Sequence, residues 1–202
     1  MKTLVQLVAV ALIVPMVTGC AMFRASVSDV NVEEKKHFDA DFDATDMRAI
    51  TQDVVDDILT GPFLKQDTPP IMMISGIQNR TSKYVDTKNL TDRMRTLLIK
   101  SGAAQFINAA RREDLLKEQG YQAANATAAT QVGIGQQLGA KYMITGSLTE
   151  MRKESARQVR ISKQEWNYYK LTMEVTDLET GLISWTTEKE FARQASKPLI
   201  GW

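Results

Sequence analysis

The sequence predicts an α/β sandwich with a mixed sheet of about five strands and about four helices. Three observations lead to this fold class. Up to residue 138, apolar residues recur at helical spacing or form short continuous runs, and from residue 141 onward they alternate with polar residues. The composition of 44% hydrophobic and 24% charged residues is typical of a soluble globular domain. We therefore expect helices interleaved with the first strands and a meander of strands at the end.

The first helix is expected over residues 47–59, where apolar residues recur at helical spacing. Thr45 or Asp46 could cap its start, and a Gly-Pro pair ends it. The continuous apolar run 71–74 then predicts a strand that is covered on both faces. Residues 78–82 are polar, so we expect a loop after this strand.

Three further helices and one short strand complete this part of the domain. A second amphipathic helix carries its apolar face over 90–98, and a short strand is expected at 105–108. The pattern then predicts helices over 111–119 and 132–138, with a loop rich in Ala and Thr at 121–130 between them. A glycine follows each of the three helices, as expected for a residue that closes the last turn.

The last third predicts three strands. Residues 141–150 form the first, and strict alternation over 169–175 indicates a half-buried second strand. The turn 177–181 joins it to the strand 182–191, so the closing pair is an antiparallel hairpin. The side chains expected in the core of this hairpin are Met173, Val175, Ile183 and Trp185.

The only cysteine of the chain, Cys20, follows a segment typical of a secretory signal peptide. Lys2 precedes an apolar run of about fourteen residues, which is shorter than the ~20 that a spanning helix needs. Residues Thr18 and Gly19 before the cysteine resemble a bacterial lipobox. That resemblance implies cleavage before Cys20 and acylation, as with palmitate, of its thiol and new amino group. The alternative is an uncleaved signal anchor with an incidental cysteine.

These features predict three regions. Residues 1–19 form the signal peptide, residues 20–43 a lipidated N-terminus with a flexible tether of polar, mixed-charge residues, and residues 44–202 a single globular domain. Ala21 resembles the sorting signal for the outer membrane, so the domain would face the periplasm. The lipid is the only membrane attachment that the sequence indicates.

No pattern indicates catalytic, metal-binding or cofactor-binding chemistry. His37 is the only histidine and lies in the tether, so neither a Ser-His-acid triad nor a zinc site is expected. The acidic residues of 39–43 lack the Gly and Glu of a calcium loop, and 133–139 lacks the third glycine of a dinucleotide loop. A net charge of +1 does not favour nucleic acid. We therefore expect no enzyme, cofactor or small-molecule substrate.

Two segments are candidate surfaces for a partner. The first follows the buried strand, where α/β folds commonly place binding loops, and consists of Asn79, Arg80, Thr81, Lys83 and Tyr84. The second is the basic segment 152–163 between two predicted strands. The alternatives are an ordinary solvated loop and the exposed, charged end of a hairpin.

The lipobox and most of residues 71–191 resemble the LpoB-type lipoproteins, which are outer-membrane activators of penicillin-binding proteins. The resemblance depends on the order of four segments: IMMISGIQNRTSKYVDT, LIKSGAAQFINAARREDL, IGQQLGAKYMITGSLTEM and YKLTMEVTDLETGLISW. It implies a single α/β domain similar to the amino-terminal domain of TolB. It also implies a protein without an active site that docks onto a bifunctional peptidoglycan synthase and stimulates its two activities. The chain departs from enterobacterial members because its tether is short and has no proline.

A secretion component is the alternative. Curli-secretion lipoproteins share a related core, a lipid anchor and a similar closing hairpin. They also carry two inserted membrane hairpins of alternating apolar residues. The corresponding segment here, 152–165, is short and charged, which favours the synthase activator.

Overall fold

The computed structural model describes residues 33–108, 139–155 and 162–198, together with the single residues 29, 31, 113, 114, 117, 127, 133 and 136. The chain divides into two compact units, Met1–Glu34 and Lys35–Trp202. The second unit contains all the helices and strands described below. None of the helices in the described part has the length and apolar character that a membrane span requires.

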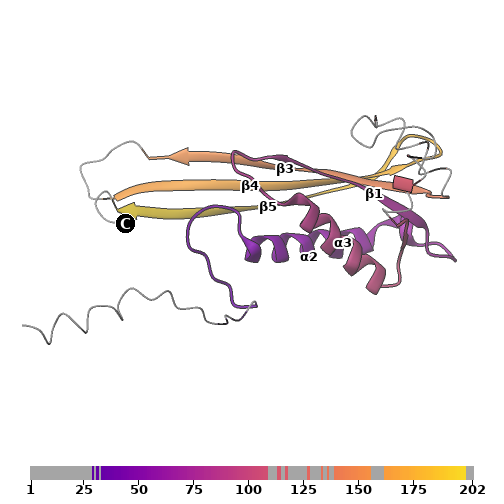
Figure 1. Cartoon of the computed structure of the whole chain (residues 1–202), viewed down its shortest axis with the longest axis horizontal. Helices are drawn as coiled ribbons and strands as arrows, with labels where there is room; N and C mark the ends of the chain where they lie inside the picture. Colours follow the sequence, from indigo (N-terminus) through magenta and orange to yellow (C-terminus); the bar gives the residue numbers. More distant parts are fainter. Residues whose placement is uncertain are drawn as a thin grey trace, which may run out of the picture. The chain divides into compact units, whose positions relative to one another are not determined.

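Five strands form one mixed sheet in the order β2-β1-β3-β4-β5 (Figure 1). Their bounds are β1 (Ile71–Arg80), β2 (Gln105–Phe106), β3 (Tyr142–Glu154), β4 (Ser162–Asp177) and β5 (Ile183–Pro198). The strand β1 is parallel to both of its neighbours, and the pairs β3–β4 and β4–β5 are antiparallel. The predicted α/β fold with a mixed five-stranded sheet is therefore confirmed.

Two helices, α2 (Ala44–Thr60) and α3 (Thr87–Lys100), pack against one face of the sheet, and the 3-10 turn η2 (Pro62–Leu64) follows α2. The N-cap of α2 is Asp43, whose side chain accepts from two backbone amides while Asp46 bonds back to the cap. The sequence placed this cap at Thr45 or Asp46. Gly61 ends the helix, as predicted.

The main core lies between the two helices and the sheet. Its fully buried side chains include Ile58, Leu98, Leu148 and Leu171. A smaller cluster of Met73, Ala140 and Leu178 lies apart from this core, and Met73 alternates along β1 with Met72 of the main core. The first half of β1 is therefore buried on both faces, as the continuous apolar run predicted.

Two local predictions in the strands were wrong. β1 continues through Arg80, so residues 78–80, which the sequence placed in the loop, belong to the strand. Ile183 is 57% exposed because of a bulge, where Val175 pairs with Trp185 but the next residue of β4 pairs with Ile183. The extra residue turns Ile183 to the opposite face from Trp185. Trp185 itself is half-buried and packs against the main core.

The end of the predicted tether belongs to the domain. The sequence began the domain at residue 44, whereas the second compact unit begins at Lys35. Residues 40–43, here called the strap, contain Ala40, which is 1% exposed, and Phe42, whose ring packs edge-on against Tyr169 at 5.6 Å. Figure 1 shows β3, β4 and β5 continuing past the two helices.

Some predictions fall on other parts of the chain. The signal peptide, Cys20, most of the loop 121–130 and most of the helices at 111–119 and 132–138 lie outside the described residues. Within those two helices, the described residues 113, 114, 117, 133 and 136 have helical conformation.

Candidate functional site

The turn after β1 is built by the side chain of Asn79. Its Nδ2 donates to the carbonyl of Lys83 at 3.0 Å, and its Oδ1 accepts from the backbone N–H of Thr81 at 3.0 Å and from the hydroxyl of Thr81 at 2.7 Å. The same hydroxyl lies 2.6 Å from the Lys83 carbonyl. Asn and Thr commonly stabilise turns in this way. Asn79 and Thr81 therefore shape the loop, which the sequence did not reveal.

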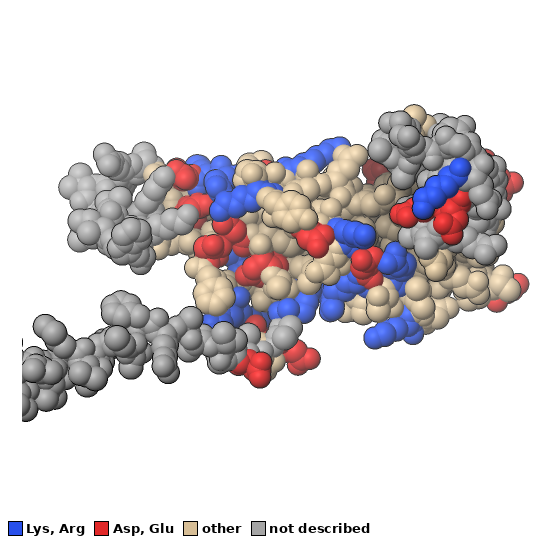
Figure 2. Space-filling model, viewed as in Figure 1, with Lys and Arg blue, Asp and Glu red and all other residues tan. Residues whose placement is uncertain are grey.

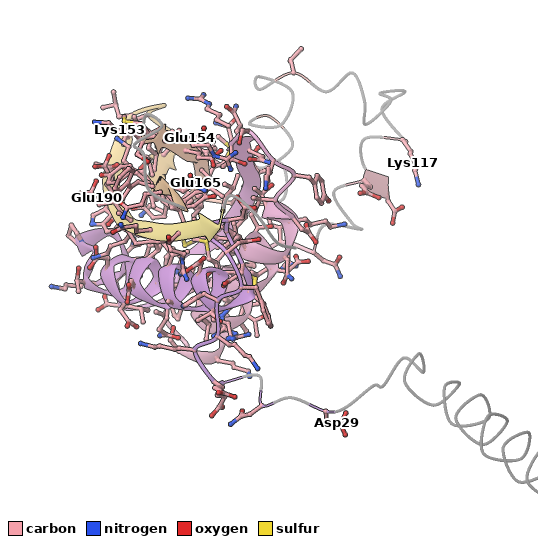
Figure 3. All side chains as sticks on the ribbon, turned by 90° about the vertical axis from the view of Figure 1, so that its left-hand side faces the viewer. Asp29, Lys117, Lys153, Glu154, Glu165 and Glu190 are labelled. Carbon is pink, nitrogen blue, oxygen red and sulfur yellow. The ribbon has the colours of Figure 1, made fainter. Side chains whose placement is uncertain are left out.

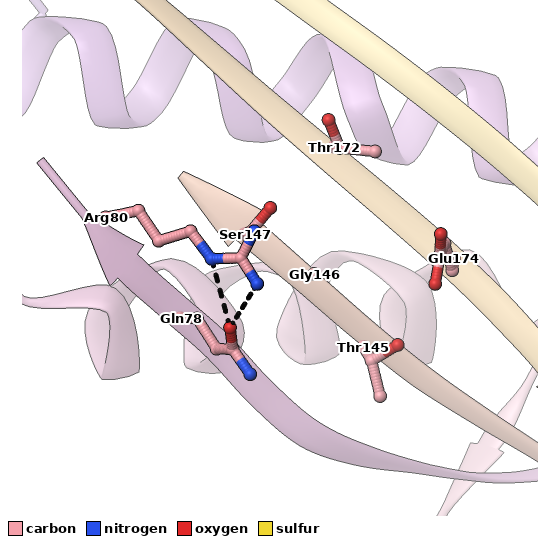
Figure 4. Close-up of a pocket in the computed structure, with 7 residues that line it drawn as sticks. All are labelled: Gln78, Arg80, Thr145, Gly146, Ser147, Thr172 and Glu174. Atoms are coloured by element: carbon pink, nitrogen blue, oxygen red, sulfur yellow. Dashed lines mark hydrogen bonds between the residues drawn. The ribbon is translucent and has the colours of Figure 1, made fainter. Parts of the chain in front are cut away.

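Arg80 lies over the sheet face that is opposite to α2 and α3. Its Nε and Nη2 donate to Oε1 of Gln78 at 3.2 and 2.7 Å (Figure 4). The two side chains border a shallow polar hollow of about 220 Å³. Its lining residues are Gln78, Arg80, Thr145, Gly146, Ser147, Thr172 and Glu174. The short side chains of β3 form the floor of the hollow, so it could receive a polar side chain of a partner.

Tyr84 is exposed to solvent, and the two residues that follow it are fixed. Its side chain is 88% exposed, whereas the next residue, Val85, packs against the main core. Asp86 then caps α3 by accepting from the amides of Lys88 and Asn89. The backbone on the α3 side of Tyr84 is therefore held in place while its ring stays free for contact.

A cluster of ion pairs lies beside this loop and is here called the ionic cluster: Asp41, Lys83, Glu150, Arg152 and Glu165. Arg152 Nη2 lies 2.9 Å from Asp41 Oδ1 and 3.4 Å from Glu150 Oε1, and its Nε lies 3.2 Å from Glu165 Oε1. Lys83 pairs with the second oxygen of Asp41. Figure 3 views this end of the sheet and shows Glu165 within the curve of the strands.

The ionic cluster is tightly partnered. Burial alone would raise the pKa of Glu150, but hydrogen bonds from Ser82 and the charge of Arg152 outweigh it, so the pKa is lowered. Burial and the nearby charge of Glu150 raise the pKa of Tyr169, which therefore stays a neutral phenol and donates to Glu150 at 3.2 Å. Glu150 is therefore a carboxylate at neutral pH and can accept from Ser82 and Tyr169 at once.

The basic segment 152–163 does not form one continuous surface in the described part. Arg152 points into the ionic cluster, whereas its neighbour Lys153 is exposed, because successive residues of a strand face opposite ways. Arg157 and Arg160 lie outside the described residues. Figure 2 shows charges of both signs mixed over the visible face. The described residues of this face therefore carry no single dominant charge that would attract a partner.

One group of side chains has the composition of a metal site. His37, Asp43 and Asp46 bring potential ligand atoms within 4.8 Å of one another. These atoms already have partners: His37 Nδ1 lies 2.6 Å from Asp43, and Arg193 pairs with Asp46. The two carboxylates also cap α2. A cation would have to displace the guanidinium and the cap, so this group is better explained as the start of the helix.

The polar face of the sheet was not recognised as a possible site from the sequence. Thr145 and Ser147 on β3 and Thr172 and Glu174 on β4 line the hollow beside Arg80. The signal was present, because these residues are the polar half of an alternating pattern. The partner surface remains a prediction for Asn79, Arg80, Thr81, Lys83 and Tyr84. In the structure, Asn79 and Thr81 shape the loop, Lys83 pairs with Asp41, and Arg80 and Tyr84 are exposed.

The sequence model of the family Peptidoglycan-synthase activator LpoB matches residues 46–191. Solved structures with a similar fold include the LpoB C-terminal domain from Salmonella enterica, with a TM-score of 0.56 and 18% identity, covering 72% of this chain and 98% of that domain. The same domain from Escherichia coli gives the same values. Lipoprotein GNA1162 from Neisseria meningitidis has a TM-score of 0.46 and 16% identity, with coverage of 63% and 85%. No curated protein matches the chain.

Proposed function

This chain belongs to the LpoB family of peptidoglycan-synthase activators, and from that premise we propose that it binds a bifunctional penicillin-binding protein and raises its activity. The observation that carries the proposal is the match of the family model to residues 46–191, which include both helices' packing surfaces and most of the sheet. The two LpoB domains from enterobacteria support the same fold. The chain would act by contact and would contribute no reacting group of its own.

Contact alone does not activate an enzyme. A ligand shifts a conformational equilibrium only when it binds one state more tightly than the other. We therefore expect the chain to bind the active conformation of the synthase more tightly. Arg80 and Tyr84 are our candidates for this contact, because both side chains are exposed and both residue types are enriched at interface hot spots.

We also propose that Cys20 carries lipid and anchors the protein to the outer membrane, facing the periplasm. The support is the sequence Thr18-Gly19-Cys20 after an apolar run. Two or more acyl chains on one residue give stable anchoring at ~0.8 kcal/mol per buried methylene. Metabolic labelling with a fatty-acid analogue should mark the wild-type protein and leave Cys20→Ser unlabelled. Equal labelling of both proteins would contradict acylation at this residue.

The activation itself is tested with the full chain in detergent and a purified bifunctional synthase from the same organism. Glycan polymerisation and peptide cross-linking are measured with and without the chain, and binding is measured in parallel. We expect the chain to raise at least one of the two rates at concentrations at which it binds. The matched control is the same chain after heat denaturation. Binding without any change in either rate, or no binding to any bifunctional synthase, would contradict the proposed function.

A further inference from the structure

The strap is attached to the sheet by polar groups as well as by its aromatic ring. The carbonyl of Ala40 accepts from Asn167 Nδ2 at 3.0 Å, and the backbone N–H of Phe42 donates to the hydroxyl of Tyr169 at 3.1 Å. The Phe42 ring also lies 6.2 Å from the ring of Phe191. Asn167 and Tyr169 are both buried. The strap therefore supplies hydrogen-bond partners to the buried amide of Asn167 and the buried hydroxyl of Tyr169.

The loop after β1 depends on the same side chains. Glu150 Oε2 accepts from the backbone N–H of Ser82 at 2.7 Å and from its hydroxyl at 2.5 Å, while Glu150 Oε1 accepts from Tyr169. Lys83 of the loop pairs with Asp41 of the strap. Tyr169 and Glu150 therefore form a chain of hydrogen bonds from the strap amide to the loop amide, and an ion pair runs beside it.

Burial makes this arrangement cooperative. The side chain of Glu150 is 3% exposed and that of Glu165 is 5% exposed, and both lie against Arg152. Buried charges are tolerated only when their partners are in place, and removing one partner is costly for those that remain. Loss of Asp41 would leave Arg152 with two carboxylates instead of three and would leave Lys83 without its ion pair. The loop would then keep its hydrogen bonds through Asn79, Thr81 and Ser82 but would lose its ion pair with the strap.

We propose that the strap and the loop after β1 are energetically coupled through the ionic cluster, so that the way in which the strap is held determines how the loop presents Tyr84. Such coupling is reciprocal, so a partner that binds the ordered loop also strengthens the attachment of the strap. The strap continues from the segment that leads back to Cys20. A pull on the N-terminal segment would therefore loosen the loop. The regulatory consequence relies on the proposed function, whereas the coupling itself does not.

The coupling is tested by hydrogen exchange of the full chain in detergent. Asp41→Asn removes both ion pairs of Asp41 and keeps the shape of its side chain, and it should speed exchange of the loop amides 81–85 by about fivefold or more. The reverse variant, Lys83→Gln, should speed exchange of the strap amides. The matched control is Asp67→Asn, which makes the same chemical change at an exposed residue in the connection before β1. It should leave both segments at the wild-type rate.

Amides of α3 provide the internal reference, because this helix packs into the main core. Faster exchange confined to the loop in Asp41→Asn and to the strap in Lys83→Gln supports the coupling. An unchanged loop in Asp41→Asn, an unchanged strap in Lys83→Gln, or an equal increase in α3 overturns it. None of these measurements requires a synthase, so their outcome is independent of the proposed function.

The regulatory consequence is tested with a synthase to which the wild-type chain binds. Asp41→Asn should weaken this binding, and Asp67→Asn should not. If Asp41→Asn binds as tightly as wild type although its loop exchanges faster, the regulatory part is overturned and the coupling stands. If the wild-type chain binds no synthase, the proposed function fails and the exchange results keep their meaning.

Discussion

Truncation of Tyr84 should separate recognition from folding. Its side chain is 88% exposed, so Tyr84→Ala should change the free energy of unfolding by no more than ~0.5 kcal/mol. For a domain of this size, such a change corresponds to about 1–2 °C in Tm. Arg80→Ala should behave similarly, because the hydrogen bonds that it loses to Gln78 lie at the surface. Calorimetry of the full chain measures both values.

The same two substitutions should weaken synthase binding by ~1–3 kcal/mol each if the loop docks. This loss corresponds to about a 5- to 150-fold increase in Kd. The assay is equilibrium binding of the detergent-solubilised chain to the purified synthase. Phe38→Ala is the matched control, because Phe38 is an equally exposed aromatic residue of the N-terminal segment at 88% exposure. It should bind like wild type.

Asn79→Ala should give a different pattern. It removes three side-chain hydrogen bonds that shape the turn, so we expect a loss of about 1–2 kcal/mol of stability together with weaker binding. Wild-type affinity in both Arg80→Ala and Tyr84→Ala would refute the assignment of this loop as the docking site. A Tm loss above ~5 °C in Tyr84→Ala would show that its ring is packed in solution.

Three further predictions concern the sheet and its charges. Gly146→Ala should destabilise the domain by ~1–3 kcal/mol in urea unfolding, because the added Cβ would lie 2.7 Å from the carbonyl oxygen of Thr172; an unchanged midpoint would contradict the β3–β4 pairing. Trp185→Ala should cost less than the ~3–5 kcal/mol of a fully buried ring, since Trp185 is half-buried. Glu150→Gln should have a lower free energy of unfolding than wild type at pH 7, as measured by urea unfolding. This difference in unfolding free energy should shrink as pH falls below the ordinary Glu pKa of 4.5. A lowered pKa contributes stability that is complete above 4.5 and is lost as pH falls from there through the lowered folded-state pKa, so a pH-independent difference in unfolding free energy between pH 7 and 3 would contradict the cluster.

Patterns that arise within one element were predictable from the sequence. The 3.6-residue periodicity located α2 and α3, and the alternation over 169–175 located the core face of β4. The glycines that follow α2 and α3, Gly61 and Gly102, also marked where these two helices end. These signals are local because each reports only which side of its own helix or strand is buried.

Features that depend on pairing between distant segments were not predictable. The bulge that exposes Ile183 is a mismatch in length between β4 and β5, and alternation along either strand alone does not reveal it. The strap has the composition of a polar tether, yet Phe42 finds an aromatic surface on β4 and β5. The loop was placed three residues too early, because β1 continues through Arg80, and the structural role of Asn79 depends on the turn geometry.

The position of the strap would limit how far the domain can reach from the lipid that we propose at Cys20. Because the compact unit begins at Lys35, only residues 21–34 lie between the anchor and the domain. Fourteen residues span at most about 50 Å when fully extended, and less under thermal motion. If the chain is anchored and docks as we propose, the synthase must bring its binding module within about 50 Å of Cys20, plus the size of the domain itself. Detaching the strap would extend this reach by only a few residues, and on the coupling proposed above it would also loosen the loop. A longer reach would therefore come with weaker binding through the loop. Lengthening the segment before Lys35 with a flexible insertion should consequently relieve the pull on the strap without changing the docking surface.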